Sequence, residues 1–333
     1  MNDFRAPRWL PGGHVQTIWP VLFSRRFDGA GPVFFSRRFD GARPVFRRER
    51  WPTPDGDFVD VDWQGEGVDS MLLVLFHGLE GSSSSHYAQA FAAEAKRRDW
   101  RFAVPHFRGC SGEINLAPRA YHSGDHEEVG WMLERFRALH AGPIVAVGVS
   151  LGGNALLRFV EEAGASAADR VRAVAAVSAP LDLAAGGRAI GRGFGRQVYT
   201  RMFMRTMKKK ALVKLGQHPG LFDAEAMRAA RDLRDFDEIF TGPLHGFAGA
   251  DDYYARSSAK AHLSHIRIPA LVLNARNDPF LPASALPRPG EVGPCVTLWQ
   301  PAHGGHVGFA DGRWPGHLKT LPGSVSGWLA DHL

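Results

Sequence analysis

Residues 145–154 have the sequence Val145-Ala146-Val147-Gly148-Val149-Ser150-Leu151-Gly152-Gly153-Asn154. An apolar run rich in β-branched residues leads into Gly-x-Ser-x-Gly, and helix-forming residues follow at once, which predicts a strand, a sharp turn and a helix. The glycines at 148 and 152 are needed because a Cβ two residues either side of the serine would collide with the neighbouring strand or helix. We therefore expect the Ser150 hydroxyl at the edge of a sheet, beside a helix N-terminus whose N–H groups can receive an oxyanion.

Strands and helices alternate on both sides of this turn. Continuous apolar runs predict strands at 71–76, 101–105, 144–149, 171–177, 268–274 and 296–299, with helices near 84–98, 125–140 and the C-terminus. Period-two alternation around Pro54-Asp55-Gly56 adds a hairpin over 48–63. Apolar strands separated by helices are typical of a sheet buried on both faces. The fold class is therefore α/β, with a mostly parallel central sheet and helices on both faces.

The alternation stops near Pro180 and resumes at Ile268. The pattern between these points is helical, which indicates an inserted helical cap over 181–265. The core is thereby divided into a first part, 47–180, and a second part, 266–333.

Residues 1–46 are interpreted as an N-terminal arm. The sequence from 7 to 20 is rich in proline and glycine and contains two tryptophans, which predicts an irregular segment anchored by those side chains. Residues 23–34 are repeated as 35–46 with one substitution. We interpret this duplication as tolerated loop length, because a longer loop adds little closure entropy. A doubled basic patch for an anionic partner is the alternative.

The composition excludes several classes of protein. With 333 residues and 44% apolar content, the chain can bury a large core. We identify no bilayer-spanning run and no secretory signal pattern, so a cytoplasmic location is expected. The two cysteines, Cys110 and Cys295, imply no disulfide framework. The net charge of +6 arises within residues 1–50, which hold ten arginines and four acids, so we expect no nucleic-acid partner.

A serine hydroxyl becomes a nucleophile when a base and a carboxylate assist it. Asp278 and His306 each follow one of the last two predicted strands, so both are expected on the sheet edge that carries Ser150. Their order along the chain, serine then aspartate then histidine, is the order associated with this turn. Asp278 has the alternative role of a turn former. His303 is a weaker candidate for the base, because the glycine pair before His306 lets the loop reach back over the serine.

An oxyanion site needs two convergent N–H donors. Leu151, the residue after the serine, supplies one of them. The loop after the strand 71–76 should supply the other, and the backbone N–H of Leu79 is our choice.

Metal and cysteine chemistry are disfavoured. His303 and His306 lack a third ligand at helical or hairpin spacing, and the segment after His122 and His126 departs from the zinc-binding helix pattern. Cys110 lies in a glycine-rich turn after a strand but lacks the spacing of the serine turn. We expect no cofactor.

Six segments together carry a specific pattern: Trp9–Thr17, His77–Ser82, Arg108–Glu113, the Ser150 turn, Asp251–Tyr254 and Gly304–Phe309. This pattern resembles the YheT-like α/β-hydrolases, bacterial relatives of the eukaryotic α/β-hydrolase-domain lipases and esterases. The resemblance implies an α/β-hydrolase fold and ester hydrolysis, with a triad at Ser150, Asp278 and His306. The duplicated segment over 23–46 departs from the family but touches no triad position.

Residues 186–220, within the predicted cap, hold nine lysines and arginines and no acid. Apolar residues lie between them, so the pattern is basic and amphipathic. It fits a solvated lid face over an apolar pocket. The sharper hypothesis is peripheral contact with anionic lipid, or recognition of an acidic group on the substrate.

The sequence as a whole predicts a lipase-like carboxylesterase that acts through an acyl-serine intermediate. Its partner would be a small-molecule ester with a short- to medium-chain or lipid-like acyl group. An acyltransferase or thioesterase using the same triad, and a non-catalytic binding module, are the alternatives. Acyl length, the alcohol and the oligomeric state are left open.

Overall fold

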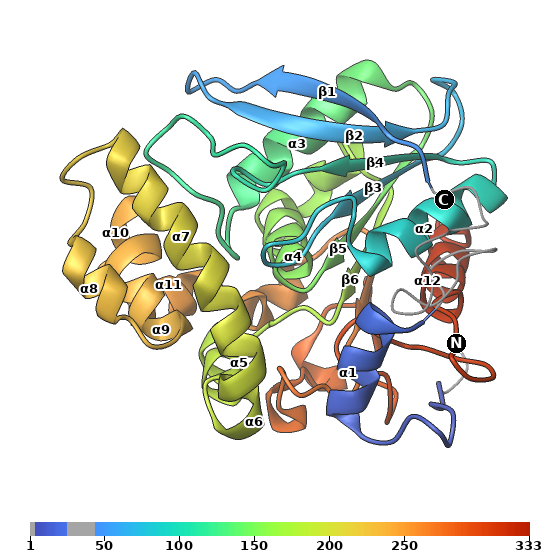
Figure 1. The fold of residues 1–333 in the computed structure, drawn as a ribbon. Coiled ribbons are helices and arrows are strands. Elements are labelled where there is room, and N and C mark those ends of the chain that lie inside the picture. The colour runs from blue at the N-terminus through green and yellow to red at the C-terminus, as the bar shows by residue number, and fades with distance from the viewer. Residues whose placement is uncertain (1–3, 25–43) are drawn as a thin grey trace.

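A computed structural model describes residues 4–24 and 44–333 (Figure 1). Its centre is an eight-stranded sheet in the order β1-β2-β4-β3-β5-β6-β7-β8. The strands are β1 (Arg47–Pro52), β2 (Phe58–Gln64), β3 (Leu72–Phe76), β4 (Arg101–Pro105), β5 (Ile144–Val149), β6 (Ala173–Val177), β7 (Ala270–Leu273) and β8 (Val296–Trp299). The pairs β1–β2 and β2–β4 are antiparallel, and the others are parallel. The predicted α/β fold class is confirmed.

Helices cover both faces of the sheet, as strand β3 illustrates. Leu72, Val74 and Phe76 pack in one core cluster with α3 (His126–Leu139) and α4 (Leu151–Ala163). Leu73 and Leu75 pack in the other, with α2 (His86–Arg97) and α12 (Thr320–Ala330). Successive side chains of a strand point to opposite faces, so a strand buried on both sides is apolar throughout.

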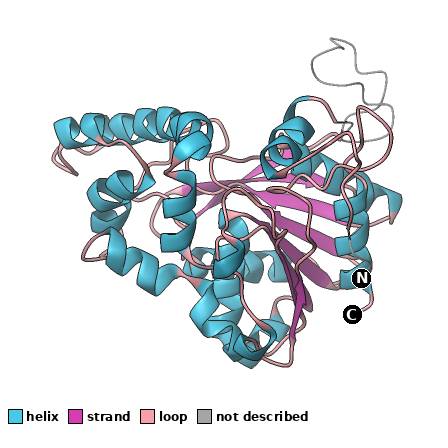
Figure 2. Ribbon diagram, turned by 90° about the horizontal axis from the view of Figure 1, so that it is seen from below, coloured by secondary structure: helices cyan, strands magenta, loops and turns pink. Residues whose placement is uncertain are grey.

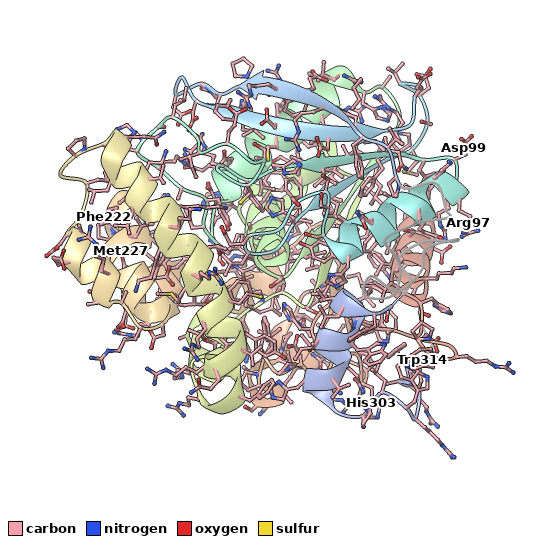
Figure 3. The ribbon with its side chains drawn as sticks, in the orientation of Figure 1. Arg97, Asp99, Phe222, Met227, His303 and Trp314 are labelled. Carbon is pink, nitrogen blue, oxygen red and sulfur yellow. The ribbon has the colours of Figure 1, made fainter. Side chains whose placement is uncertain are left out.

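The segment between β6 and β7 is helical and lies beside the sheet (Figures 1 and 2). It contains α5 (Leu183–Ile190), α6 (Gly193–Gly195), α7 (Arg201–Gln217), α8 (Ala224–Ala229), α9 (Leu233–Phe236), α10 (Gly242–Leu244) and α11 (Ala250–Ser257). Two π-helical turns, Arg196–Thr200 and Asp237–Thr241, lie between these helices. The segment has a core of its own, to which Phe222 and Met227 contribute (Figure 3).

The prediction of an irregular segment over 7–20 is wrong, because Gly13–Leu22 form a helix, α1. Pro20 lies inside α1, near its C-terminal end. Proline disfavours a helix at such a position because it lacks the backbone N–H and its ring clashes with the preceding turn. Tertiary contacts outweigh that preference: the Trp19 indole N–H donates to the Pro315 carbonyl oxygen over 2.8 Å. The tryptophans do anchor this segment, since the Trp9 indole also donates to the Gly312 carbonyl. Most of the duplicated segment, 25–43, lies outside the described residues.

Candidate active site

Ser150 lies on the sharp turn between β5 and α4. Its φ is +52°, a conformation that non-glycine residues rarely adopt. A Cβ on Gly152 would come within 2.5 Å of the carbonyl oxygens of Phe76 and His77, so only glycine lets α4 lie this close to the end of β3. As the sequence predicts, the turn follows a strand, holds Ser150 in a strained backbone conformation and brings α4 close to the end of β3.

The structure brings the three predicted side chains into one hydrogen-bonded chain. His306 Nε2 lies 3.0 Å from Ser150 Oγ, and His306 Nδ1 lies 2.8 Å from Asp278 Oδ2. Asp278 can only accept when ionised, so Nδ1 carries the proton and Nε2 is free to accept from the serine. The ring of Phe280 stacks on the imidazole at a centroid distance of 4.0 Å. His303 instead lies exposed at the periphery of the molecule (Figure 3).

Helix α1 supports the loop that carries His306, which the sequence reasoning missed. Thr17 Oγ1 accepts a hydrogen bond from the backbone N–H of His306 at 2.9 Å. Gln16 Oε1 accepts from the backbone N–H of Gly304 at 2.9 Å and from the side-chain amide of Asn277 at 2.8 Å. These side chains belong to one of the segments that carry the family resemblance, but nothing in their local pattern indicates a partner almost 300 residues away.

Two backbone N–H groups beside the serine are available for an oxyanion. In the loop after β3, the N–H of Gly78 donates to Tyr87 and that of Glu80 donates to Tyr121, each over 2.9 Å. The N–H of Leu79 between them makes no hydrogen bond within the described residues. Leu151 is the first residue of α4, so its N–H has no acceptor within the helix.

A partly buried cluster of Glu80, Tyr121 and Lys210 fixes the loop next to Leu79. Glu80 has a φ of +56°. Its carboxylate accepts from the Tyr121 hydroxyl at 3.0 Å and from Lys210 Nζ, on α7, at 2.9 Å. The helical segment thus holds the loop directly by an ion pair.

The cavity in front of Ser150 and His306 has a volume of about 110 Å³. Helices α5, α7 and α11 border it together with the loop that follows β7. A neighbouring cavity of about 80 Å³ shares Leu79, Leu151 and Asp237 with it. Burial raises the pKa of Asp237 to about 6.

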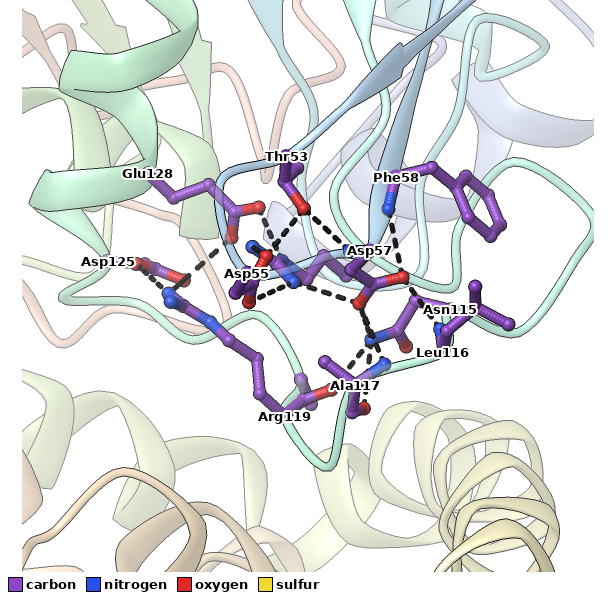
Figure 4. A network of polar contacts seen from close by, with 12 residues as sticks. Thr53, Asp55, Asp57, Phe58, Asn115, Leu116, Ala117, Arg119, Asp125 and Glu128 are labelled. Atoms are coloured by element: carbon purple, nitrogen blue, oxygen red, sulfur yellow. Dashed lines mark hydrogen bonds and ion pairs between the residues drawn. The ribbon is translucent and has the colours of Figure 1, made fainter.

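A second polar cluster organises the loop that follows β4 (Figure 4). The buried guanidinium of Arg108 binds Asp55 and Asp57 at 2.8 Å and Glu128 at 2.7 Å. Asp57 also accepts from Asn115 at 2.7 Å, and its pKa is lowered by such hydrogen bonds despite its burial. The hairpin, the loop and the start of α3 are joined in this way.

The remaining candidates do not join the site. Burial raises the pKa of the Cys110 thiol to about 11, which disfavours the reactive thiolate. Burial lowers the pKa of His122 to about 4, and its ring packs on His245. Within residues 4–24 and 44–333, no three histidine, cysteine or acidic side chains are placed to hold a metal ion. No helix of the same residues has the length and apolar character needed to cross a membrane.

Comparisons with known proteins agree with this architecture. A model of the alpha/beta hydrolase fold matches residues 72–313. The protein named "Putative esterase YheT" of Escherichia coli (strain K12) is 36% identical over 99% of this chain and 94% of its own length. Phospholipase ABHD3 of Mus musculus is 30% identical over 81% of this chain and 67% of its own. A solved esterase from Thermogutta terrifontis shares the fold, with a TM-score of 0.51 and 17% identity over 86% of this chain and 100% of that one.

Proposed function

The chain belongs to the α/β-hydrolase family, and on that premise we propose that it cleaves carboxylic esters through an acyl-serine intermediate. The observation that carries the proposal is the hydrogen-bonded chain from Ser150 through His306 to Asp278, beside two backbone N–H groups that make no hydrogen bond to any described residue. The names of the relatives, an esterase and a phospholipase, support ester chemistry.

Each residue has a defined role in the proposed reaction. Ser150 Oγ attacks the ester carbonyl while His306 Nε2 takes its proton, and Asp278 stabilises the resulting imidazolium. The N–H groups of Leu79 and Leu151 receive the negative charge that forms on the carbonyl oxygen. His306 then gives the proton to the departing alcohol, and a water molecule repeats the sequence on the acyl-enzyme.

A p-nitrophenyl ester series of increasing acyl length, compared with Ser150→Ala, tests this function. We expect turnover by the parent protein and loss of several powers of ten in the variant. Equal rates in the two proteins would refute the assignment. Labelling of Ser150 by a fluorophosphonate separates an enzyme from a binding module, and partition of the acyl group between water and added alcohols or thiols separates hydrolysis from acyl transfer.

We further propose that residues 181–265 act as a cap that contacts anionic lipid. Arg188, Arg192, Arg196, Arg201 and Arg205 are exposed there, and none forms an ion pair with a described residue. Phe194 and Met202 are 50% and 55% exposed among them. Cationic side chains around exposed apolar ones are suited to an anionic membrane surface.

Flotation with vesicles of phosphatidylglycerol and phosphatidylcholine tests the contact. Binding should rise with the anionic fraction and fall when Arg201 and Arg205 are both changed to glutamate. Reversal of Arg47 and Arg97, which are 66% and 65% exposed at their side chains, is the charge-matched control. Figure 3 places Arg97 far from the helical segment. Equal binding at all lipid compositions would refute the contact.

A further inference from the structure

The cavity that contains Ser150 and His306 has an unusual charge distribution. Most of its lining is apolar or aromatic, and Asp237 is the acidic residue in it. Among the described residues, no lysine or arginine lines this cavity. Asp237 therefore lines a cavity to which no described lysine or arginine contributes.

Asp237 has neutral partners where comparable aspartates have charged ones. Tyr254 donates to Oδ2 at 2.8 Å and Thr241 donates to Oδ1 at 2.6 Å. No described residue forms an ion pair with it, whereas Asp57 and Asp62 bind arginines. Burying a carboxylate without a cation is unfavourable, and the raised pKa of Asp237 reflects that burial.

The cations nearest along the cavity wall are already engaged. Arg108, Lys210 and Lys214 line the neighbouring cavity, which Asp237 also borders, and Arg108 is held by the three carboxylates already described. Lys210 pairs with Glu80 at 2.9 Å, and Lys214 donates to backbone carbonyl oxygens of the loop after β4. Among the described residues, none of these cations pairs with Asp237.

Aromatic rings complete the surroundings of this carboxylate. Tyr253 and Tyr254 of α11 line the same cavity, with ring centroids 5.4 Å apart. Aromatic faces attract cations, and their attraction adds to that of a carboxylate when water is excluded. A carboxylate also keeps lone pairs for further donors after accepting two hydrogen bonds.

We propose that Asp237, with Tyr253 and Tyr254, binds a positively charged ammonium group carried by the ester substrate. This inference rests on the proposed ester hydrolysis and deepens it, because it makes Asp237 a specificity-determining residue. The π-helical turn Asp237–Thr241 would then have the function of placing the carboxylate at the cavity, as such turns often do at functional sites.

Two thioesters of nearly equal shape test the proposal, butyrylthiocholine and its neutral 3,3-dimethylbutyl isostere. The parent protein should have a kcat/KM at least tenfold higher for the charged ester, measured by release of the thiol. Asp237→Asn keeps an acceptor for Tyr254 but removes the charge, so the ratio of the two kcat/KM values should fall at least tenfold. Asp251→Asn changes the net charge equally on an exposed part of α11 and should leave the ratio unchanged.

A ratio near one in the parent protein, or an unchanged ratio in Asp237→Asn, would overturn the proposal. Calorimetric binding of both esters to Ser150→Ala separates it from the proposed function. Tighter binding of the charged ester that Asp237→Asn abolishes supports the ammonium site even if neither ester is cleaved. Equal binding of the two esters refutes the site even if both are cleaved.

Discussion

Replacing Lys210 by methionine should lower turnover while leaving substrate binding nearly intact. Methionine keeps most of the apolar stem of lysine but removes the ammonium that binds Glu80 at 2.9 Å. Glu80 follows Leu79, whose N–H is one of the two proposed oxyanion donors. The substitution therefore loosens the loop at Glu80, next to the Leu79 donor, and leaves Ser150, His306 and Asp278 unchanged.

The magnitude follows from two limits. Complete loss of one oxyanion donor lowers kcat by about two to three powers of ten. A hydrogen bond between charged groups contributes roughly 1.5–3 kcal/mol to the stability of the arrangement that contains it. Solvent screening reduces that contribution when the lysine is partly exposed. The side chain of Lys210 is 33% exposed, and Tyr121 still holds Glu80 in the variant. We expect a loss of about 1.4 kcal/mol, or roughly tenfold in kcat.

Pre-steady-state hydrolysis of a p-nitrophenyl ester measures this effect in the acylation step. Lys208→Met is the matched control, because Lys208 also lies on α7 but donates to the carbonyl oxygens of Arg228 and Ala230. The Lys208 variant should acylate at the parent rate. Equal acylation rates in the parent and the Lys210 variant would refute the role of the ion pair, and so would an equal loss in both variants.

Arg108→Met should lower the free energy of unfolding by about 3–5 kcal/mol in calorimetry, because it leaves the buried carboxylate of Asp57 without its ionic partner. Arg234→Met, at an exposed ion pair, should leave the free energy of unfolding nearly unchanged, and similar losses in the two variants would contradict this reasoning. The pKa of Asp237 is raised from 3.8 to about 6, so its stabilising contribution is present at low pH and is lost as the pH rises through 6. Asp237→Asn should therefore raise the melting temperature more at pH 8 than at pH 4.5, and an equal shift at both would count against the buried charge. Gly152→Ala should destabilise the protein by about 1–3 kcal/mol or more, because the added Cβ clashes with two carbonyl oxygens. Gly216→Ala, whose Cβ meets open space on α7, should be neutral or stabilising. Comparable melting temperatures of the two variants would refute the clash at Gly152.

The sheet and the turn at Ser150 could be predicted because their signals are local. Strand β3 is apolar at every position since both of its faces are buried, and the Gly-x-Ser-x-Gly spacing reflects contacts within a few residues of the serine. The order of Ser150, Asp278 and His306 followed from the order of the strands. The structure places these three within hydrogen-bond distance, and their catalytic role stays a prediction.

The contacts that support the site could not be predicted in the same way. The pairing of Lys210 with Glu80 joins residues 130 positions apart in the sequence. Asp237 resembles any aspartate on a helix until the fold buries it beside the cavity. Helix α1 was missed because Pro20 argues against a helix, whereas the contacts of Trp19 and Thr17 with distant loops decide the outcome.

Helix α1 lies outside residues 72–313, the part that the family model matches, yet its Thr17 and Gln16 hold the loop of His306. A chain shortened to begin at residue 47 would keep Ser150, Asp278 and His306 but lose the support of the His306 loop. Ser150 in such a fragment should react slowly with a fluorophosphonate, although all eight strands are still in the chain. A synthetic peptide covering residues 4–24 should then restore the reactivity of Ser150 when it is added to the fragment, because the two pieces can reassemble without a covalent link.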